Sequence, residues 1–292
     1  MNVIAQAVEG SIVTGSIYGL LGVGFALLFR ASKVLSFCQG GFMLLGAFLF
    51  YDLQEPGGGS FAVSVLVTVV VVAAFSGLVY LVVFARVAAR EAFATSVATI
   101  GLAGVLQAVF AVRYGTAPLS LPDGVVSGEA FRVFSAVVPV ADLIAVGMAA
   151  AATASLVVML RFTPLGQRMN AVADNASLAE HLGISAARVA ALAWALAGAT
   201  AALAGIAFSL RSSVDPVGVA NIGLFAFPAI ILGGLDSVGG ALLGGIILGA
   251  VQNTVQVAFG SSWVDLVSFL VMLAILLVRP SGLFGRTEVV RL

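Results

Sequence analysis

Charged side chains are scarce in this sequence: 13 basic and 13 acidic residues make up only 9% of its 292 residues. A soluble domain carries about a quarter charged residues, so the composition excludes an ordinary globular protein. The formal net charge is zero, and no basic or acidic run is present. These features argue against nucleic acid as a partner and against a charged membrane surface as the main partner.

Side chains that perform catalysis or bind metals are almost absent. Cys38 is the only cysteine, which excludes an intramolecular disulfide and a two-cysteine metal site. His181 is the only histidine, so we expect a solvated loop residue rather than part of a zinc or Ser–His site. Lys33, the only lysine, lacks the glycines of a P-loop. We therefore expect no catalytic residue, no metal, no bound cofactor and no ATP hydrolysis by this chain alone.

Long hydrophobic runs fill the chain instead. Hydrophobic residues make up 61% of it, and a helix of about 20 such residues crosses roughly 30 Å of hydrocarbon. This predicts an all-α polytopic membrane protein, with about eight to nine transmembrane helices in one transmembrane domain over residues 1–292. The expected spans lie near 10–29, 34–52, 61–85, 92–112, 133–160, 189–210, 217–234, 238–258 and 263–278.

Basic residues indicate which ends of the spans face the cytoplasm, where Lys and Arg concentrate. With nine crossings and a cytoplasmic C-terminus, ten basic residues lie inside and three outside. The inside set is Arg30, Lys33, Arg86, Arg90, Arg161, Arg168, Arg188, Arg279, Arg286 and Arg291, and the outside set is Arg113, Arg132 and Arg211. We therefore expect the C-terminus in the cytoplasm.

Two spans contain glycine-rich interruptions, SFCQGG at 36–41 and GGLDSVGG at 233–240, the second following Pro228. We expect both spans to be broken or half-length helices. Irregular backbone at membrane depth survives only where it is buried in protein or lines a polar cavity. One interruption lies in each half of the chain, which is the pattern of a pathway built from related repeats.

The residues at these interruptions, with one residue of a later helix, are the candidate translocation pathway. They are Ser36, Gln39, Gly40, Gly41, Gly233, Gly234, Asp236, Ser237, Gly239, Gly240 and Asn253. Each of them could instead serve helix breaking or packing, and Asp236 is either a turn residue or a pathway residue. No charged ring is present, so a small neutral or zwitterionic solute fits best.

Glycine pairs with small-xxx-small spacing indicate where helices approach closely in lipid. The pairs are Gly15 with Gly19, Gly240 with Gly244, and Gly245 with Gly249. We interpret them as ordinary helix packing.

A polar stretch, TPLGQRMNAVADNASLAEHLGIS, separates two hydrophobic runs at 163–185. Thr163 followed by Pro164 predicts a helix start, and Ser177 with Glu180 predicts a capping box. Gly183 predicts a stop before Ser185 begins the next span. The sequence thus predicts two short amphipathic helices.

One face of these helices carries an apolar stripe, formed by Leu165, Met169, Val172, Ala176, Ala179 and Leu182. A helix lying on lipid is one explanation, but such helices are rich in Lys, Arg and bulky apolar residues, whereas two of the six residues of this stripe are alanine. Docking of this face into a groove of a cytosolic protein is the interpretation we favour.

The sequence resembles the LivH-type permease subunit of branched-chain amino acid ABC importers. Three stretches carry the resemblance: 15–48, 163–185 and 229–253. It implies a subunit that pairs with a second, related permease, receives solute from an extracytoplasmic binding protein and is driven by two cytosolic ATP-binding subunits, which use the ATP. It implies a bacterial or archaeal cytoplasmic membrane. It also implies an ATPase-coupling loop with a contact surface formed by Arg168, Ala171, Asp174, Asn175 and Gly183.

The chain departs from the family pattern in SFCQGG and in DSVGG, which leaves the cargo open. Branched-chain or related amino acids are the first expectation, and urea, short amides or aromatic acids are the alternative. A channel or secondary transporter working alone is a further alternative. That class predicts uptake without ATPases, and the acidic residues near span ends make ion coupling less suitable.

Overall fold

The computed structural model describes residues 2–32, 34–55, 59–88, 92–122, 125–126, 128–133 and 136–285, which form a bundle of long helices. Within these residues, eight helical segments are long and apolar enough to cross a membrane: Val8–Ser32, Phe61–Val87, Phe93–Tyr114, Val140–Phe162, Ala186–Ser209, Pro216–Gly233, Val238–Phe259 and Ser261–Val278. The expected polytopic all-α fold is confirmed.

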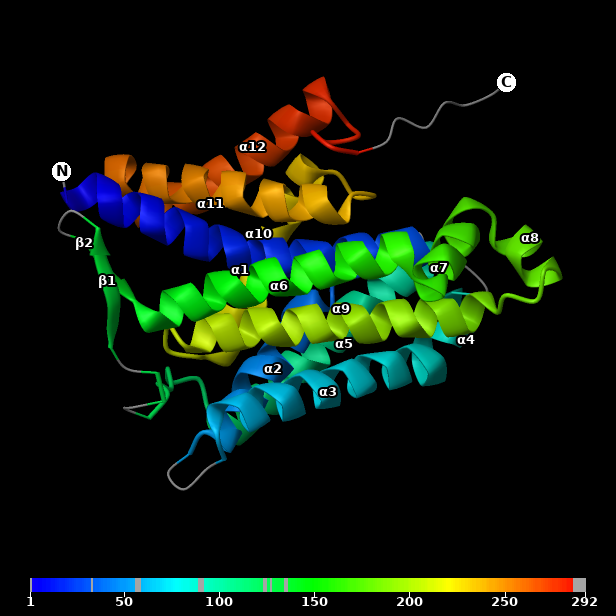
Figure 1. Ribbon diagram of the computed structural model, residues 1–292, viewed down its shortest axis with the longest axis horizontal. Coiled ribbons are helices and arrows are strands. Elements are labelled where there is room, and N and C mark those ends of the chain that lie inside the picture. Colours follow the sequence, from blue (N-terminus) through cyan, green and yellow to red (C-terminus); the bar gives the residue numbers. More distant parts are fainter. Residues whose placement is uncertain are drawn as a thin grey trace.

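The long helices lie side by side and run roughly along the longest axis of the molecule (Figure 1). The elements in chain order are α1 Asn2–Ser32, α2 Gln39–Leu53, α3 Phe61–Val79, a π-helical turn Tyr80–Phe84, α4 Ala85–Ala88, α5 Ala92–Tyr114, β1 Glu129–Val133, β2 Ala136–Pro139, α6 Val140–Phe162, α7 Pro164–Asp174, α8 Ala176–His181, α9 Ala186–Ser209, α10 Pro216–Gly233, α11 Val238–Phe259, a 3₁₀ turn Ser261–Trp263 and α12 Val264–Val278. We call the two ends of the bundle the hairpin end, where β1 and β2 lie, and the α7–α8 end.

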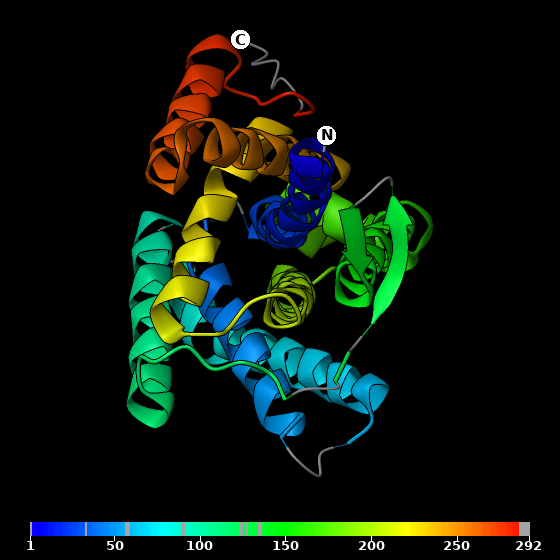
Figure 2. The same cartoon turned by 90° about the vertical axis from the view of Figure 1, so that its left-hand side faces the viewer.

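Helices α1 and α9 form the centre of the bundle, and α3, α5 and α12 lie at its periphery (Figure 2). In the most apolar window of α1, 83% of the residues are buried, against 6% for the span that contains α12. The large exposed hydrophobic side chains of α12 are aliphatic, as expected of a surface facing lipid.

The contact between α1 and α11 is a glycine contact. A Cβ atom added at Gly245 would lie 2.4 Å from the Gly19 nitrogen, and one at Gly249 would lie 2.6 Å from the Gly15 nitrogen. The third pair serves another contact, because a Cβ at Gly244 would lie 2.2 Å from the Ala229 oxygen of α10. The expected packing role of these pairs is confirmed.

The chain crosses the bundle nine times when α2 is counted. After α1, residues 34–38 run without helical structure back among the helices, and α2 completes the crossing with 15 residues. The expected half-length helix at 34–52 is confirmed. The described chain begins at the hairpin end and leaves α12 at the α7–α8 end (Figure 1). Residues 286–292, on which the expected cytoplasmic C-terminus falls, lie outside the described residues.

The expected span at 133–160 is wrong at its start. Residues Ala136–Pro139 form β2, which pairs antiparallel with β1, and α6 begins only at Val140. Pro139 is in extended conformation and has no N–H group, so it cannot continue a helix toward the strand. A second extended contact at the hairpin end joins Leu119 to Val214 through two backbone hydrogen bonds.

Candidate coupling loop and translocation route

The loop 163–185 is joined to the last transmembrane turn of α6 by one residue. Thr163 ends α6 and begins α7: its hydroxyl donates to the Met159 carbonyl (2.7 Å) and accepts from the Gly166 N–H (3.3 Å). Gly166 lies so close to α6 that an added Cβ would come within 2.4 Å of the Leu160 oxygen. The expected Thr163–Pro164 start is confirmed, and Gly166 was missed although glycine is the usual signal for such an approach.

The second helix of the loop starts differently from our expectation. Asn175, not Ser177, caps α8, because its side chain accepts from the Leu178 N–H (3.0 Å). The capping box of Ser177 with Glu180 is therefore wrong, since both residues lie inside the helix. Gly183 has a φ of +83° just after α8, and the Ser185 side chain caps α9, so the predicted stop and restart are confirmed.

Half of the apolar stripe of the loop faces the helices of this chain. Met169, Val172 and Ala179 are buried in the core of this chain, where α7 contacts α1, α6 and α9. The expectation that this stripe docks into a partner is wrong for these three residues, because the bundle already covers them. The short turn at Thr163–Gly166 folds α7 back onto the bundle end (Figure 1).

The opposite face of the loop is exposed and contains four of the five predicted contact residues. Arg168, Asp174, Asn175 and Gly183 are exposed, whereas Ala171 is half-buried against the core. Leu178, which sequence reasoning missed as a contact residue, and Leu182, which belongs to the stripe predicted to dock, are 58% and 73% exposed. Two protruding leucines among polar residues are the usual composition of a protein contact.

The first interruption brings a polar side chain into the middle of the bundle. Gln39 is fully buried, and neither its amide nitrogen nor its oxygen has a hydrogen-bond partner. A Cβ atom built on Gly24 of α1 would lie 2.1 Å from the Gln39 Nε2 atom and 2.7 Å from Thr200 Oγ1, which places Gln39 between α1 and α9. Ser36 is also buried, with its hydroxyl 3.0 Å from the Cys38 sulfur.

Gly40 and Gly41 let α2 pack between two other helices. A Cβ atom at Gly40 would lie 2.7 Å from the Ala220 oxygen of α10, and one at Gly41 would lie 2.9 Å from the Leu106 side chain of α5. Both glycines line a cavity of about 380 Å³, which Gln107 and Asn221 also line. These two amides were missed, because neither lies in a glycine-rich segment.

The second interruption is a turn at the α7–α8 end. The expected broken or half-length helix at 217–234 is wrong. Helix α10 continues through Pro228 to Gly233, and its 18 residues are enough to make it one of the eight long segments. A proline removes only one bond of the helical ladder, and neighbouring helices support the backbone. Gly234 follows with a φ of +101°, and Ser237 caps α11 by accepting from the Gly240 N–H.

Segment 281–285, beyond the last span, covers this turn. The N–H groups of Leu283 and Phe284 donate to the last carbonyls of α10, at Leu232 (2.9 Å) and Gly233 (3.2 Å). Gly233 and Gly240 face each other, since a Cβ on Gly233 would lie 2.2 Å from the Gly240 oxygen, whereas Gly239 faces open space. Gly233, Gly234 and Gly240 therefore serve packing, and a pathway role for them stays a prediction.

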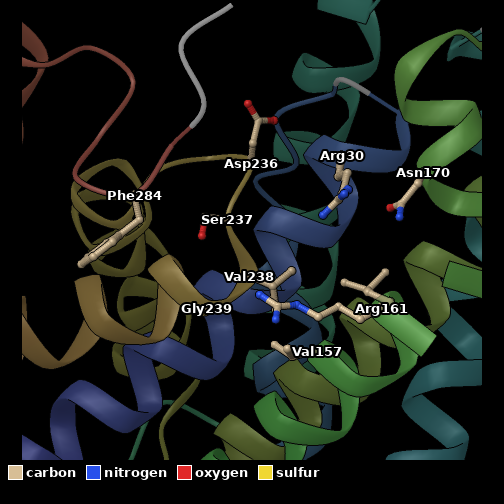
Figure 3. A pocket seen from close by; sticks show the side chains of 10 residues that line it. Arg30, Val157, Arg161, Asn170, Asp236, Ser237, Val238, Gly239 and Phe284 are labelled. Atoms are coloured by element: carbon tan, nitrogen blue, oxygen red, sulfur yellow. The ribbon is translucent and has the colours of Figure 1, made fainter. Parts of the chain in front are cut away.

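Two cavities at the α7–α8 end connect these elements. One of about 450 Å³ is lined by Arg30, Arg161, Asn170, Asp236, Ser237 and Phe284, and in Figure 3 Arg30 lies between the 236–239 turn and Asn170 of the coupling loop. The other, of about 680 Å³, is lined by Leu35, which directly precedes the first interruption, and by Leu235 of the second. The turn at Asp236 thus lies beside the coupling loop.

Asn253 lies apart from both interruptions. Its amide nitrogen donates to the Gly249 carbonyl (3.0 Å), and its oxygen lies near Gly10 and Arg211 toward the hairpin end. The neighbouring Gln252 donates to the Ser268 hydroxyl (2.8 Å) and so joins α11 to α12. Among the described residues, no group of three or more His, Cys, Asp or Glu side chains could hold a metal ion.

Long apolar helices, a half-length helix with a polar start inside the bundle and a structured loop at one end define a multi-pass membrane permease. The chain belongs to the family described as the permease component of branched-chain amino acid transport systems, whose model matches residues 7–276.

Relatives with the family's description match over nearly the whole chain, and a ribose permease matches over part of it. The high-affinity branched-chain amino acid transport system permease protein LivH of Escherichia coli K12 is 25% identical, covering 97% of this chain and 96% of its own length. BraD of Pseudomonas aeruginosa, of the same description, is 26% identical over 98% and 97%. The ribose import permease protein RbsC of Bacillus subtilis is 33% identical over 43% of this chain and 42% of its own. No solved structure matches the chain significantly.

Proposed function

We propose that this chain is the permease subunit of an ATP-driven importer that carries branched-chain or related amino acids across the cytoplasmic membrane of a bacterium or archaeon. The relatives with that description support the cargo, and the sparse charge of the spans fits a zwitterionic solute. Urea, short amides and aromatic acids are the competing cargoes, and no feature of the described residues favours them.

The coupling loop carries the proposal. Two cytosolic ATP-binding subunits bind and hydrolyse the ATP, and this chain binds no cofactor of its own. One of them contacts the exposed face of α7 and α8, formed by Arg168, Asp174, Asn175 and Gly183 with Leu178 and Leu182. Because Thr163 and Gly166 hold α7 against α6, a displacement of the loop moves the end of α6 and the adjoining 236–239 turn. Alternating access then follows as a two-state rearrangement.

The orientation and the remaining partners follow from the same arrangement. We place the α7–α8 end in the cytoplasm, because Arg30, Arg161, Arg168 and Arg279 gather there. The hairpin end then faces outward and receives an extracytoplasmic solute-binding protein. The bridge between Leu119 and Val214 stabilises the outward loops, which surround a cavity of about 280 Å³. A second, related permease subunit completes the membrane part.

The loop contact can be tested by truncating its protruding side chains. We expect the double variant Leu178→Ala and Leu182→Ala to lose most of the co-purifying ATP-binding subunits and most leucine uptake, because exposed apolar anchors dominate such interfaces. Phe259→Ala is the matched control, since Phe259 is 72% exposed near the hairpin end. Full assembly and uptake in the double variant would show that the loop is not the ATPase contact.

A further inference from the structure

Two amide side chains lie on the surface of membrane-spanning helices. Asn221 of α10 is exposed and Gln107 of α5 is half-exposed, and both lie within segments long and apolar enough to cross a membrane. Gln107 is seven residues from the end of α5 at Tyr114, and Asn221 is five residues from the start of α10 at Pro216. At 1.5 Å per residue, both are about 8–10 Å from the hairpin end of their helices. An amide facing hydrocarbon without a partner costs free energy, so this surface does not simply face lipid.

The exposed faces of other peripheral helices differ. The large exposed hydrophobic side chains of α3 and α12 are aliphatic, as in Val70 and Leu270, and the exposed Asp265 is the second residue of α12. On α5, by contrast, Gly101 and Gly104 face open space next to Gln107. Helices α5 and α10 lie side by side at the left edge of Figure 2 and contact each other. Gln256 of α11 is also exposed, but it lies three residues from the end of that helix at Phe259, whereas Gln107 and Asn221 lie deeper and line the same cavity between α5 and α10.

This face is hollowed by the cavity of about 380 Å³ that Gln107 and Asn221 line. Phe25 and Phe37 also line it, and both rings contact Phe227, with ring centroids 5.3 Å and 4.9 Å away. Gly40 and Gly41 of α2 complete the wall between α5 and α10. The cavity thus combines two hydrogen-bonding groups with aromatic rings, which is the composition of a site for a small amphipathic molecule.

We propose that this cavity is the solute-contact wall of the translocation route, with Gln107 and Asn221 as the residues that recognise the polar end of the solute. Each amide both donates and accepts, so the pair suits the ammonium and carboxylate groups of a zwitterion, while Phe25 and Phe37 contact its apolar side chain. The solute class rests on the proposed function. The assignment of the route to the α5–α10 face rests on the position of the two amides.

Cysteine accessibility tests the position of the route. The native Cys38 is fully buried, so single substitutions can be labelled in the assembled transporter in membrane vesicles. We expect the water-soluble reagent 2-sulfonatoethyl methanethiosulfonate to modify Gln107→Cys and Asn221→Cys at least about tenfold faster than Val70→Cys and Leu270→Cys, because only a thiol in contact with water ionises and reacts. If all four thiols reacted equally slowly, the α5–α10 face would border lipid and the proposal would be wrong.

A transport measurement tests recognition. We expect the double variant Gln107→Leu and Asn221→Leu to import about tenfold less leucine per ATP hydrolysed, because the solute loses hydrogen bonds in a low-dielectric site, while ATP hydrolysis stays within about twofold of the unsubstituted complex. Val105→Leu, another substitution on exposed α5 surface, is the control. Unchanged import per ATP would overturn the recognition role. A transporter that did not import leucine before substitution would contradict the proposed function, while the labelling result would still decide the route.

Discussion

At the scale of single residues, four glycines set the distance between α1 and α11. Gly15, Gly19, Gly245 and Gly249 bring backbone atoms so close that no side chain fits between the helices. In lipid, where no hydrophobic drive holds helices together, such close packing supplies much of the association free energy. The contact therefore tolerates no additional atom.

Adding one methyl group at this contact should destabilise the bundle. We expect Gly245→Ala and Gly249→Ala each to lower the free energy of unfolding by about 1–3 kcal/mol, because overpacking forces the helices apart. Gly147→Ala in α6 is the control, since an added Cβ there has no neighbour within 4 Å. Thermal unfolding of the purified protein in detergent would measure the difference. Equal melting temperatures for all three variants would contradict the tight contact.

A second residue-scale prediction concerns the single thiol. Cys38 is fully buried beside Ser36, and a buried thiol is inert toward reagents that need a solvated thiolate. We expect maleimide to leave the folded protein unmodified and to modify one site after denaturation. Mass spectrometry of both samples would show it, with Leu182→Cys, at an exposed position, as the positive control.

At the scale of elements, α7 and α8 show what a sequence can and cannot predict. The start at Thr163, the stop at Gly183 and the restart at Ser185 are local hydrogen-bonding patterns, and the sequence predicted them. The face that is buried depends on how α7 folds back onto α1, α6 and α9, so the stripe alone could not identify it.

The predictions for other parts of the chain were right or wrong for the same physical reason. The glycine interruption before α2 was predicted, because glycine-rich backbone in a hydrophobic run is a local signal. The strand pair β1–β2 was missed, because its pairing lies next to an apolar run that reads as a continuing helix. Gln107 and Asn221 were missed because they come together only when α5 packs beside α10.

The contribution of the Thr163 cap to the stability of α7 can be measured. We expect Thr163→Ala to increase amide exchange across Pro164–Asp174 while α6 stays protected, since losing a threonine cap costs a helix about 1 kcal/mol. Thr163→Ser keeps the hydroxyl and should restore protection. Hydrogen–deuterium exchange measures both variants, and equal exchange in the alanine and serine variants would show that the hydroxyl does not hold α7.

At the scale of the whole molecule, we expect the two bundle ends to lie on opposite sides of a membrane, because the eight long segments run between them. The hairpin end carries the Leu119–Val214 bridge, and the α7–α8 end carries the loop 163–185. We expect an impermeant thiol reagent applied to intact cells to label Ala117→Cys and to spare Leu182→Cys, with the reverse in inside-out vesicles. Labelling of both positions from one side would contradict this placement of the two bundle ends on opposite sides.

The half-length helix α2 also constrains how the protein is made. Its 15 residues span about 22 Å as a helix, short of the roughly 30 Å of hydrocarbon, and it begins with the polar Gln39. Its packing partners α5, α9 and α10 are synthesised later, α10 ending only at Gly233. Until these helices have been synthesised, α2 lacks the packing partners that stabilise it, and lipid alone does not stabilise it. We therefore expect the membrane insertion of α2 to be completed late in biogenesis, by the second half of the chain.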